Sequence, residues 1–215
     1  PDQRERSSPF RGGTMKSRIM IYGVDSFMGA LASRAAMRRG ISHVAAGRNI
    51  AGVAQHAAAV AKEADNALAE PRTFTLGDKA RIASQLDDVG VVVNCGPLEG
   101  GELLSLMDAC LSTGTHYIDM TSERTQIAAI AAHDEMAKRA NVMVMAGAGF
   151  DYAAIDTVAE RLAQILRGAR AVTIAVKRGA PTLPEARRLV AALMAEGETL
   201  RNGQFVPARG GERSI

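Results

Sequence analysis

The sequence of 215 residues predicts an α/β protein whose first part is a doubly wound parallel sheet. Short apolar runs alternate six times with segments of helical periodicity, as repeated βαβ units require. The first run leads into a turn with glycines at 23 and 29, which is typical of a dinucleotide-binding strand–turn–helix. There is no Trp and only 4% of residues are aromatic, so the core is mostly aliphatic, as suits helices packed on a parallel sheet. We therefore expect a Rossmann domain, followed by the beginning of a small α+β domain.

Each predicted strand is a short apolar run that ends at glycine or at polar residues. The predicted strands cover 18–22, 43–46, 72–76, 90–94, 116–120 and 142–146. The predicted helices between them cover 28–39, 53–68, 79–86, 101–112 and a segment from a Thr121 or Ser122 cap to residue 139. Gly40 is well placed to end the first helix, and the Val-Val-Val centre of the fourth strand indicates a buried strand. Six strands with their helices make up a complete doubly wound domain.

The pattern changes after residue 152. We expect a helix over 154–166, a more polar strand over 171–177, a helix introduced by Pro181 and Pro184 that runs to about 196, and a hairpin around Asn202-Gly203. The predicted division is a disordered leader over 1–14, a dinucleotide-binding domain over 15–152, and a partial second domain over 153–215. That second domain, for substrate or dimerisation, is expected to begin here without being completed.

Composition excludes several classes of function. A net charge of +3, from 26 basic and 23 acidic residues, is too even to indicate a nucleic-acid-binding protein. No apolar run approaches the roughly 18 residues that span a bilayer. Cys95 and Cys110 have no metal-binding or CxxC spacing, so we expect a disulfide-free cytoplasmic protein. The four histidines are scattered and are expected at strand edges or on the surface, without a metal site.

The glycine turn is the first candidate site. Gly23 allows a sharp turn out of the strand and Gly29 allows close helix packing, while the helix N-terminus between them faces a pyrophosphate. Ser26 stands where a middle glycine is usual, and its hydroxyl could partly compensate for the Cβ. The alternative is a tight βα turn without a ligand.

The ends of the next strands extend this site. Arg48, in Gly47-Arg48-Asn49, can clamp a 2′-phosphate and favours NADP over NAD, unless it is only a solvated surface residue. Asp78 either accepts from the adenine amino group or caps a helix. Cys95 is interpreted as a packing residue rather than a nucleophile. The residues expected to contact the cofactor are Gly23, Asp25, Ser26, Phe27, Met28, Gly29, Arg48, Asn49, Asp78, Asn94, Cys95 and Gly96.

Catalytic residues are not assigned by the sequence. The carboxylates expected near the same crevice are Asp119, Glu123, Asp151 and Asp156, and each has a cap or a solvated carboxylate as its alternative. A short-chain dehydrogenase would need Tyr-x-x-x-Lys. Four residues after Tyr22, Tyr117 and Tyr152 stand Ser, Thr and Asp, so this class is disfavoured.

Several of these segments together resemble a known family. They are Ile19–Gly29, Ala45–Asn49, Val91–Pro97, DACLSTGTHYIDMTSE at 108–123 and AGAGFDYAAID at 146–156. The chain resembles the saccharopine dehydrogenase-like oxidoreductases and, within them, the trans-acting enoyl reductases. The resemblance covers about 16–166 and persists more weakly to about 207. It departs from the family at Ser26, in the Asn-Cys segment before Gly96-Pro97, and in the short second domain.

The resemblance implies an NADP-binding Rossmann domain and a second domain that forms much of a substrate site and often a dimer interface. Two functions stay open at this point. One is an NADP-dependent reductase that transfers a hydride to a small molecule. The other is a non-catalytic or truncated NAD(P)-binding module. A homodimer is an open alternative to a monomer, and the substrate leaves no readable signature.

Overall fold

The computed structural model describes residues 16–63, 66–98 and 101–168, and of the C-terminal part 179, 186–187, 190–191, 194, 197–201 and 204–208. The chain divides into two compact units, Pro1–Gly168 and Ala169–Ile215. The predicted leader over 1–14 and the predicted strand over 171–177 lie outside the described residues. Residue 152, the predicted domain boundary, falls within a continuous helix, Phe150–Ile165. The division into functional domains stays a prediction.

The first unit is built on a parallel sheet of six strands in the order β3-β2-β1-β4-β5-β6. The strands are β1 (Arg18–Tyr22), β2 (His43–Gly47), β3 (Ala69–Thr73), β4 (Val89–Asn94), β5 (His116–Asp119) and β6 (Val144–Met145). The order reverses between β1 and β4, which is the switch point where doubly wound sheets bind ligands beyond the carboxyl ends of their strands. The predicted Rossmann fold is confirmed.

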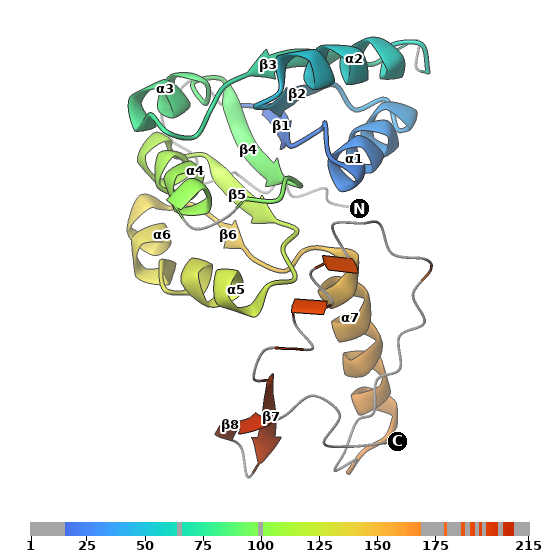
Figure 1. Ribbon diagram of the computed structural model, residues 1–215, viewed down its shortest axis with the longest axis vertical. Coiled ribbons are helices and arrows are strands. Elements are labelled where there is room, and N and C mark those ends of the chain that lie inside the picture. Colours follow the sequence, from blue (N-terminus) through green and yellow to red (C-terminus); the bar gives the residue numbers. More distant parts are fainter. Residues whose placement is uncertain are drawn as a thin grey trace, which may run out of the picture. The chain divides into compact units, whose positions relative to one another are not determined.

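Helices cover both faces of this sheet (Figure 1). They are α1 (Phe27–Arg38), α2 (Ile50–Val60), α3 (Lys79–Ser84), α4 (Gly101–Thr113), α5 (Arg124–Ala131) and α6 (Asp134–Ala140). A further helix, α7 (Phe150–Ile165), follows β6, and its described side chains are mostly exposed. One core cluster packs Ile21 and Ala45 against α1 and α2. The other packs Met20 and Tyr22 against α3 and α4. Alternate residues of β1 thus point to opposite faces, so each face has its own helices.

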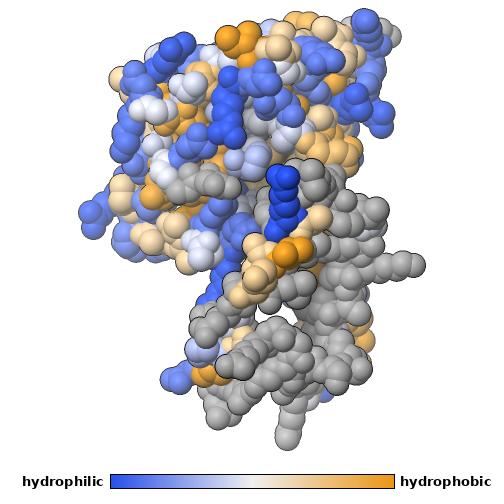
Figure 2. Space-filling model, in the orientation of Figure 1, coloured by the Kyte–Doolittle hydropathy of each residue, from blue (hydrophilic) through white to orange (hydrophobic). Residues whose placement is uncertain are grey.

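The second helix and third strand differ from the predicted ones. The helix starts earlier than predicted because Asn49 caps it, its side chain accepting a hydrogen bond from the Gly52 amide at 3.1 Å, and it ends at Val60 instead of residue 68. The strand lies three residues earlier than predicted and contains Pro71. A proline, which lacks an N–H, is tolerated because β3 is an edge strand. Ala51, Ala54 and Ala58 of α2 are exposed, and Figure 2 shows pale-orange side chains over this helix.

Two further boundaries were wrong. The single helix predicted to run to residue 139 is two helices, α5 and α6, separated at Ala132 and His133. The sixth strand is only two residues long, Val144–Met145. In the second unit the predicted hairpin is confirmed, because β7 (Gly197–Arg201) pairs antiparallel with β8 (Gln204–Ala208). The helix predicted to end near 196 falls mostly outside the described residues.

Two histidines are buried rather than exposed, which corrects the prediction for them. His43 Nε2 and His56 Nε2 each lie 2.7 Å from the Ser33 hydroxyl, between α1, α2 and β2. His43 Nδ1 also lies 3.3 Å from the Ile41 carbonyl. Burial lowers the pKa of both rings, so the neutral forms are favoured in the folded chain. The sequence spacing did not reveal this pair because a serine on another helix joins them.

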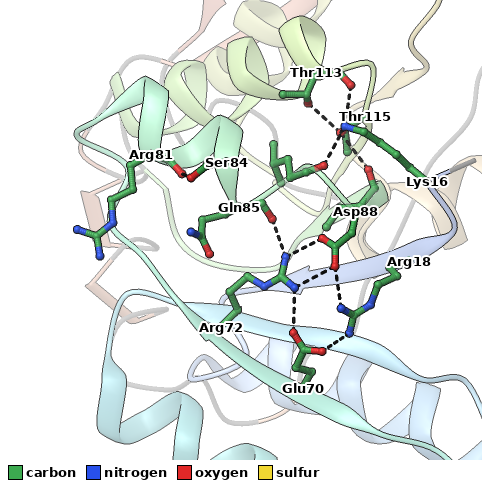
Figure 3. Close-up of polar contacts among 12 residues, drawn as sticks. Lys16, Arg18, Glu70, Arg72, Arg81, Ser84, Gln85, Asp88, Thr113 and Thr115 are labelled. Atoms are coloured by element: carbon green, nitrogen blue, oxygen red, sulfur yellow. Dashed lines mark hydrogen bonds and ion pairs between the residues drawn. The ribbon is translucent and has the colours of Figure 1, made fainter. Parts of the chain in front are cut away.

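The amino ends of the strands are held by an ion network (Figure 3). Arg72 Nη1 donates to Asp88 at 2.8 Å, and its Nη2 donates to Glu70 at 2.9 Å. Arg18 donates to the same two carboxylates, at 2.8 and 2.6 Å. Beside the network, Lys16 Nζ donates to the carbonyls of Leu86 and Thr113 at 2.9 and 2.8 Å. These bonds join β1, β3 and the start of β4. They lie toward the end of the sheet opposite the glycine turn.

We expect this network to make the fold sensitive to acid. Hydrogen bonds from Arg72 hold the pKa of Asp88 well below its usual range, and those from Arg18 lower the pKa of Glu70. A lowered folded-state pKa contributes stability that is fully present above the unfolded value of about 4. That stability is lost as pH falls from there through the lowered folded-state pKa. Asp88→Asn should therefore cost about 1 kcal/mol at pH 7 and remove part of the acid dependence.

Chemical unfolding at neutral and acid pH measures this effect. Asp87→Asn, at the exposed neighbouring carboxylate, is the matched control. If Asp88→Asn lost as much stability at acid pH as the unmodified chain does, Asp88 would not be a source of the acid sensitivity.

Within the residues described, no helix has the length and apolar character needed to cross a bilayer.

Candidate functional site

The glycine turn between β1 and α1 is sterically closed around its two glycines. Gly23 has φ of +84°, and a Cβ there would lie 2.5 Å from the Cα and N of Gly96, after β4. A Cβ on Gly29 would collide with the Gly23 carbonyl. The turn therefore packs directly against the end of β4, and both positions need glycine.

Ser26 fixes this turn through its side chain. Its hydroxyl accepts from the Gly29 amide at 3.1 Å, which caps α1, and donates to the Cys95 carbonyl at 3.1 Å. Both bonds of the hydroxyl are thus made within the protein, and a contact from Ser26 to the cofactor stays a prediction. The amides of Phe27 and Met28 lie in the first turn of α1, where N–H groups have no carbonyl acceptor within the helix. They are the donors that a pyrophosphate can use.

A pocket of about 200 Å³ opens at the carboxyl ends of β1, β2 and β4. It is lined by Tyr22, Gly23, Asp25, Ser26, Arg48, Gly96, Pro97 and Leu98. Its volume is below the roughly 300–1,000 Å³ of small-molecule pockets, so it has room for one part of a dinucleotide rather than the whole. The structure thus brings together predicted residues from three separate segments of the chain. Phe27 is 72% exposed outside it, and Met28 packs against the core beneath α1.

Arg48 extends from the end of β2 and is half exposed. Its Nη1 donates to both carboxylate oxygens of Glu102, at 3.0 and 3.1 Å. Glu102 lies in the first turn of α4, where a negative charge also favours the helix dipole. The guanidinium is therefore held by a counter-ion that the sequence analysis missed, because nothing in the local pattern relates these two positions.

Asn49 and Asp78 both act as helix caps. The Asn49 side chain caps α2, and Asp78 Oδ1 accepts from the amides of Ala80 and Arg81 at 3.0 and 3.2 Å at the start of α3. The sequence left two roles open for Asp78, a contact with the adenine amino group and a helix cap, and these two hydrogen bonds are those of a cap. A contact from either residue to the cofactor stays a prediction.

Asn94 ends β4 and is buried in a polar network. Its Nδ2 donates to Asp119 Oδ2 at 2.9 Å, and its Oδ1 accepts from the Gly96 amide at 3.1 Å. The Tyr117 hydroxyl donates to the same Asp119 oxygen, and the Thr121 amide donates to the other at 2.7 Å. Asn94 thereby holds the Gly96 backbone against the glycine turn, and both ends of its amide are occupied by the protein.

Cys95 follows Asn94 and is also buried. Burial raises the pKa of its thiol to about 12, and its sulfur lies 3.1 Å from the sulfur of Met120. A thiol with so high a pKa is a poor nucleophile, which agrees with its interpretation as a packing residue.

The four candidate carboxylates lie in different surroundings. Asp119 is 1% exposed, and both of its oxygens accept hydrogen bonds from protein groups. Glu123 is exposed at the start of α5, and Asp156 is exposed on α7. Asp151 lies in α7, but its side chain is outside the described residues. Tyr22, Pro97 and Leu98 were not predicted to line the site, because apolar or ring residues beside a glycine turn carry no specific signal. The described residues hold no cluster of His, Cys, Asp or Glu that could bind a metal ion.

Comparisons with known proteins agree with this arrangement. A family model described as the saccharopine dehydrogenase NADP binding domain matches residues 20–148, from within β1 to just beyond β6. The apo structure of saccharopine dehydrogenase (L-Glu forming) from Saccharomyces cerevisiae matches with a TM-score of 0.52 and 15% identity, over 66% of this chain and 31% of that one. A short-chain type dehydrogenase/reductase from Mycobacterium ulcerans matches with a TM-score of 0.50 and 13% identity, over 60% of this chain and 65% of that one.

At such identities the two structures show the fold alone. The chain covers less than a third of the length of the yeast enzyme. No curated protein sequence matches it significantly.

Proposed function

Because the chain belongs to the saccharopine dehydrogenase NADP-binding domain family, we propose that it is an NADP-dependent oxidoreductase that transfers a hydride to or from a small molecule. The observation that carries the proposal is the pocket in which the glycine turn, Arg48 and the end of β4 meet. The nicotinamide supplies the hydride when the cofactor is bound. The chain itself binds and orients it.

Different residues of the site suit different parts of the cofactor. The first-turn amides of α1, at Phe27 and Met28, suit the pyrophosphate because they combine free donors with the positive end of the helix dipole. Gly23 and Gly96 pack directly on each other, which holds the turn that carries these amides against the end of β4. Arg48 suits the 2′-phosphate, provided that the phosphate replaces Glu102 as its partner.

The substrate class that we propose is an acyl compound with a carbon–carbon double bond. Its support is the resemblance of segments 108–123 and 146–156 to the trans-acting enoyl reductases. A carbon–nitrogen double bond is the alternative within the same family. We also propose a homodimer, because the second domain often forms a dimer interface in the family that the chain resembles.

The second candidate function is an NADP-binding module without turnover. It is favoured by one observation: the family model that matches describes a cofactor-binding domain, over residues 20–148. Incubation with NADPH and enoyl-acyl or imino substrates separates the two. Oxidation of NADPH supports the oxidoreductase, and binding without oxidation supports the module.

Cofactor binding itself gives a quantitative prediction. Arg48→Ala should weaken NADPH about tenfold or more while leaving NADH within about twofold, because only NADPH offers a 2′-phosphate to the guanidinium. Nicotinamide fluorescence during titration measures both dissociation constants. Arg34→Ala, on the exposed side of α1, is the matched control. Equal losses for both cofactors would contradict the role of Arg48, and a chain that binds neither would overturn the proposed function.

A further inference from the structure

In dinucleotide-binding folds a carboxylate at the end of the second strand usually accepts hydrogen bonds from the adenosine ribose. In this chain β2 ends at Gly47, which has no side chain, and Arg48 follows. By sequence alone the ribose acceptor is therefore missing, and the site looks committed to the phosphorylated cofactor.

Another residue fills the space at Gly47. A Cβ there would lie 2.9 Å from Asp25 Oδ1, and a Cβ on Gly52, in α2, would lie 3.0 Å from the Asp25 Cβ. The Asp25 side chain therefore reaches from the glycine turn across the end of β2, and it can do so because both neighbouring positions are glycine. Asp25 also lines the pocket that contains Arg48.

The Asp25 carboxylate is available to a ligand. It is exposed, and no hydrogen bond or ion pair joins it to another residue in the described part of the chain. Other polar side chains around the turn differ in this respect, because Ser26 and Asn49 are used as caps and Arg48 is paired with Glu102.

We propose that Asp25 is a specificity-determining residue that accepts hydrogen bonds from the adenosine ribose, so that the site takes NADH as well as NADPH. The inference rests on the proposed function and deepens it. Asp25 supplies, from the glycine turn, the carboxylate that most NAD sites take from the end of the second strand. Arg48 supplies the positive charge for the phosphorylated cofactor from the same pocket.

The charges around the pocket explain why neither cofactor is excluded. The pKa of the Tyr22 phenol is raised to about 12 chiefly by burial, while Arg48 lowers it and both Glu102 and Asp25 raise it. One cation and two carboxylates thus act on the same phenol. NADPH must displace Glu102 from Arg48 and bring its phosphate near Asp25, whereas NADH brings only hydroxyls, which a carboxylate accepts readily.

The test is the ratio of two dissociation constants in the full chain. We expect wild-type protein to bind NADH within about tenfold of NADPH. Asp25→Asn keeps the shape but removes the charge, so it should weaken NADH about threefold to tenfold and tighten NADPH by a similar factor. Asp25→Ser, which has a shorter neutral side chain, should shift the ratio in the same direction. Asp134→Asn, at an exposed carboxylate on α6, should leave it unchanged.

Opposite changes for the two cofactors are a result that a purely structural role would not produce, because a distorted turn weakens both. Parallel weakening, or an unchanged ratio in both Asp25 variants, would overturn this inference while leaving NADP binding intact. Wild-type protein that binds NADPH but no NADH would also overturn it. Absence of binding by either cofactor would instead refute the proposed function.

Discussion

Gly23→Ala is expected to lower the free energy of unfolding by about 2–5 kcal/mol and to abolish measurable NADPH binding. Two costs add at this position. A non-glycine residue at φ of +84° is strained, by about 1–2 kcal/mol. The added Cβ would also lie 2.5 Å from backbone atoms of Gly96, which cannot rotate away as a flexible side chain would. Forcing such a contact costs about another 1–3 kcal/mol.

Relief of that contact must separate the turn from the end of β4. This movement opens the place where the phosphates are expected, so cofactor binding falls with stability. Chemical unfolding and NADPH titration of the same variant measure the two effects together.

Gly40 provides a control with nearly the same backbone conformation. Its φ is +71°, but a Cβ there has no other atom within 4 Å. Gly40→Ala should therefore show the conformational cost alone, about 1–2 kcal/mol, with NADPH binding unchanged. If the two alanine variants lost the same stability, the predicted clash between a Cβ at position 23 and Gly96 would make no contribution to the free energy of unfolding.

The sheet was predictable because its strands are coded locally. The run around Val91–Val93 is apolar throughout, and glycine or polar residues end each neighbouring strand. β3 was misplaced because Pro71 argues against a strand, and only its place at the sheet edge makes the proline acceptable. The break between α5 and α6 likewise has no proline or glycine to mark it.

The site was predictable only where one segment carries it. The glycine turn and Arg48 could be found because spacing along the chain defines them. Glu102, by contrast, meets Arg48 across the ends of β1 and β4, and no local pattern joins positions 54 residues apart. Asp25 was expected to contact the cofactor, but only the empty side-chain positions of Gly47 and Gly52 show that its carboxylate lies at the end of β2.

Asp119 illustrates the same limit with a larger consequence. The sequence places it at the end of a strand that faces the crevice, where it was a candidate acid or base. The structure buries it, with one oxygen shared by Asn94 and Tyr117 and the other bound to the Thr121 amide. Burial and the Asp119 carboxylate both raise the pKa of the Tyr117 phenol, so the tyrosine stays a neutral donor. Asp119 therefore acts on the site through Asn94 and Gly96.

Asp119→Leu is accordingly expected to lower the free energy of unfolding by about 3–5 kcal/mol. Leucine keeps the branching at Cγ but is larger than aspartate, and it leaves three donors, two of them buried, without their acceptor. Asp119→Asn should cost less, because the amide oxygen still accepts from one of them. Circular dichroism during urea unfolding measures the loss.

Glu123→Ala is the matched control, since this carboxylate is exposed and its side chain makes no capping bond, and it should change stability by less than about 0.5 kcal/mol. Replacement of Asp119 also distinguishes a positioning residue from a catalytic acid or base, because the two roles predict different effects on stability, NADPH binding and turnover. A positioning residue, when replaced, weakens NADPH binding along with stability, because Asn94 no longer holds the Gly96 amide against the turn. An acid or base, when replaced, would leave stability and NADPH affinity intact and remove only turnover, and that outcome would return Asp119 to the reaction itself.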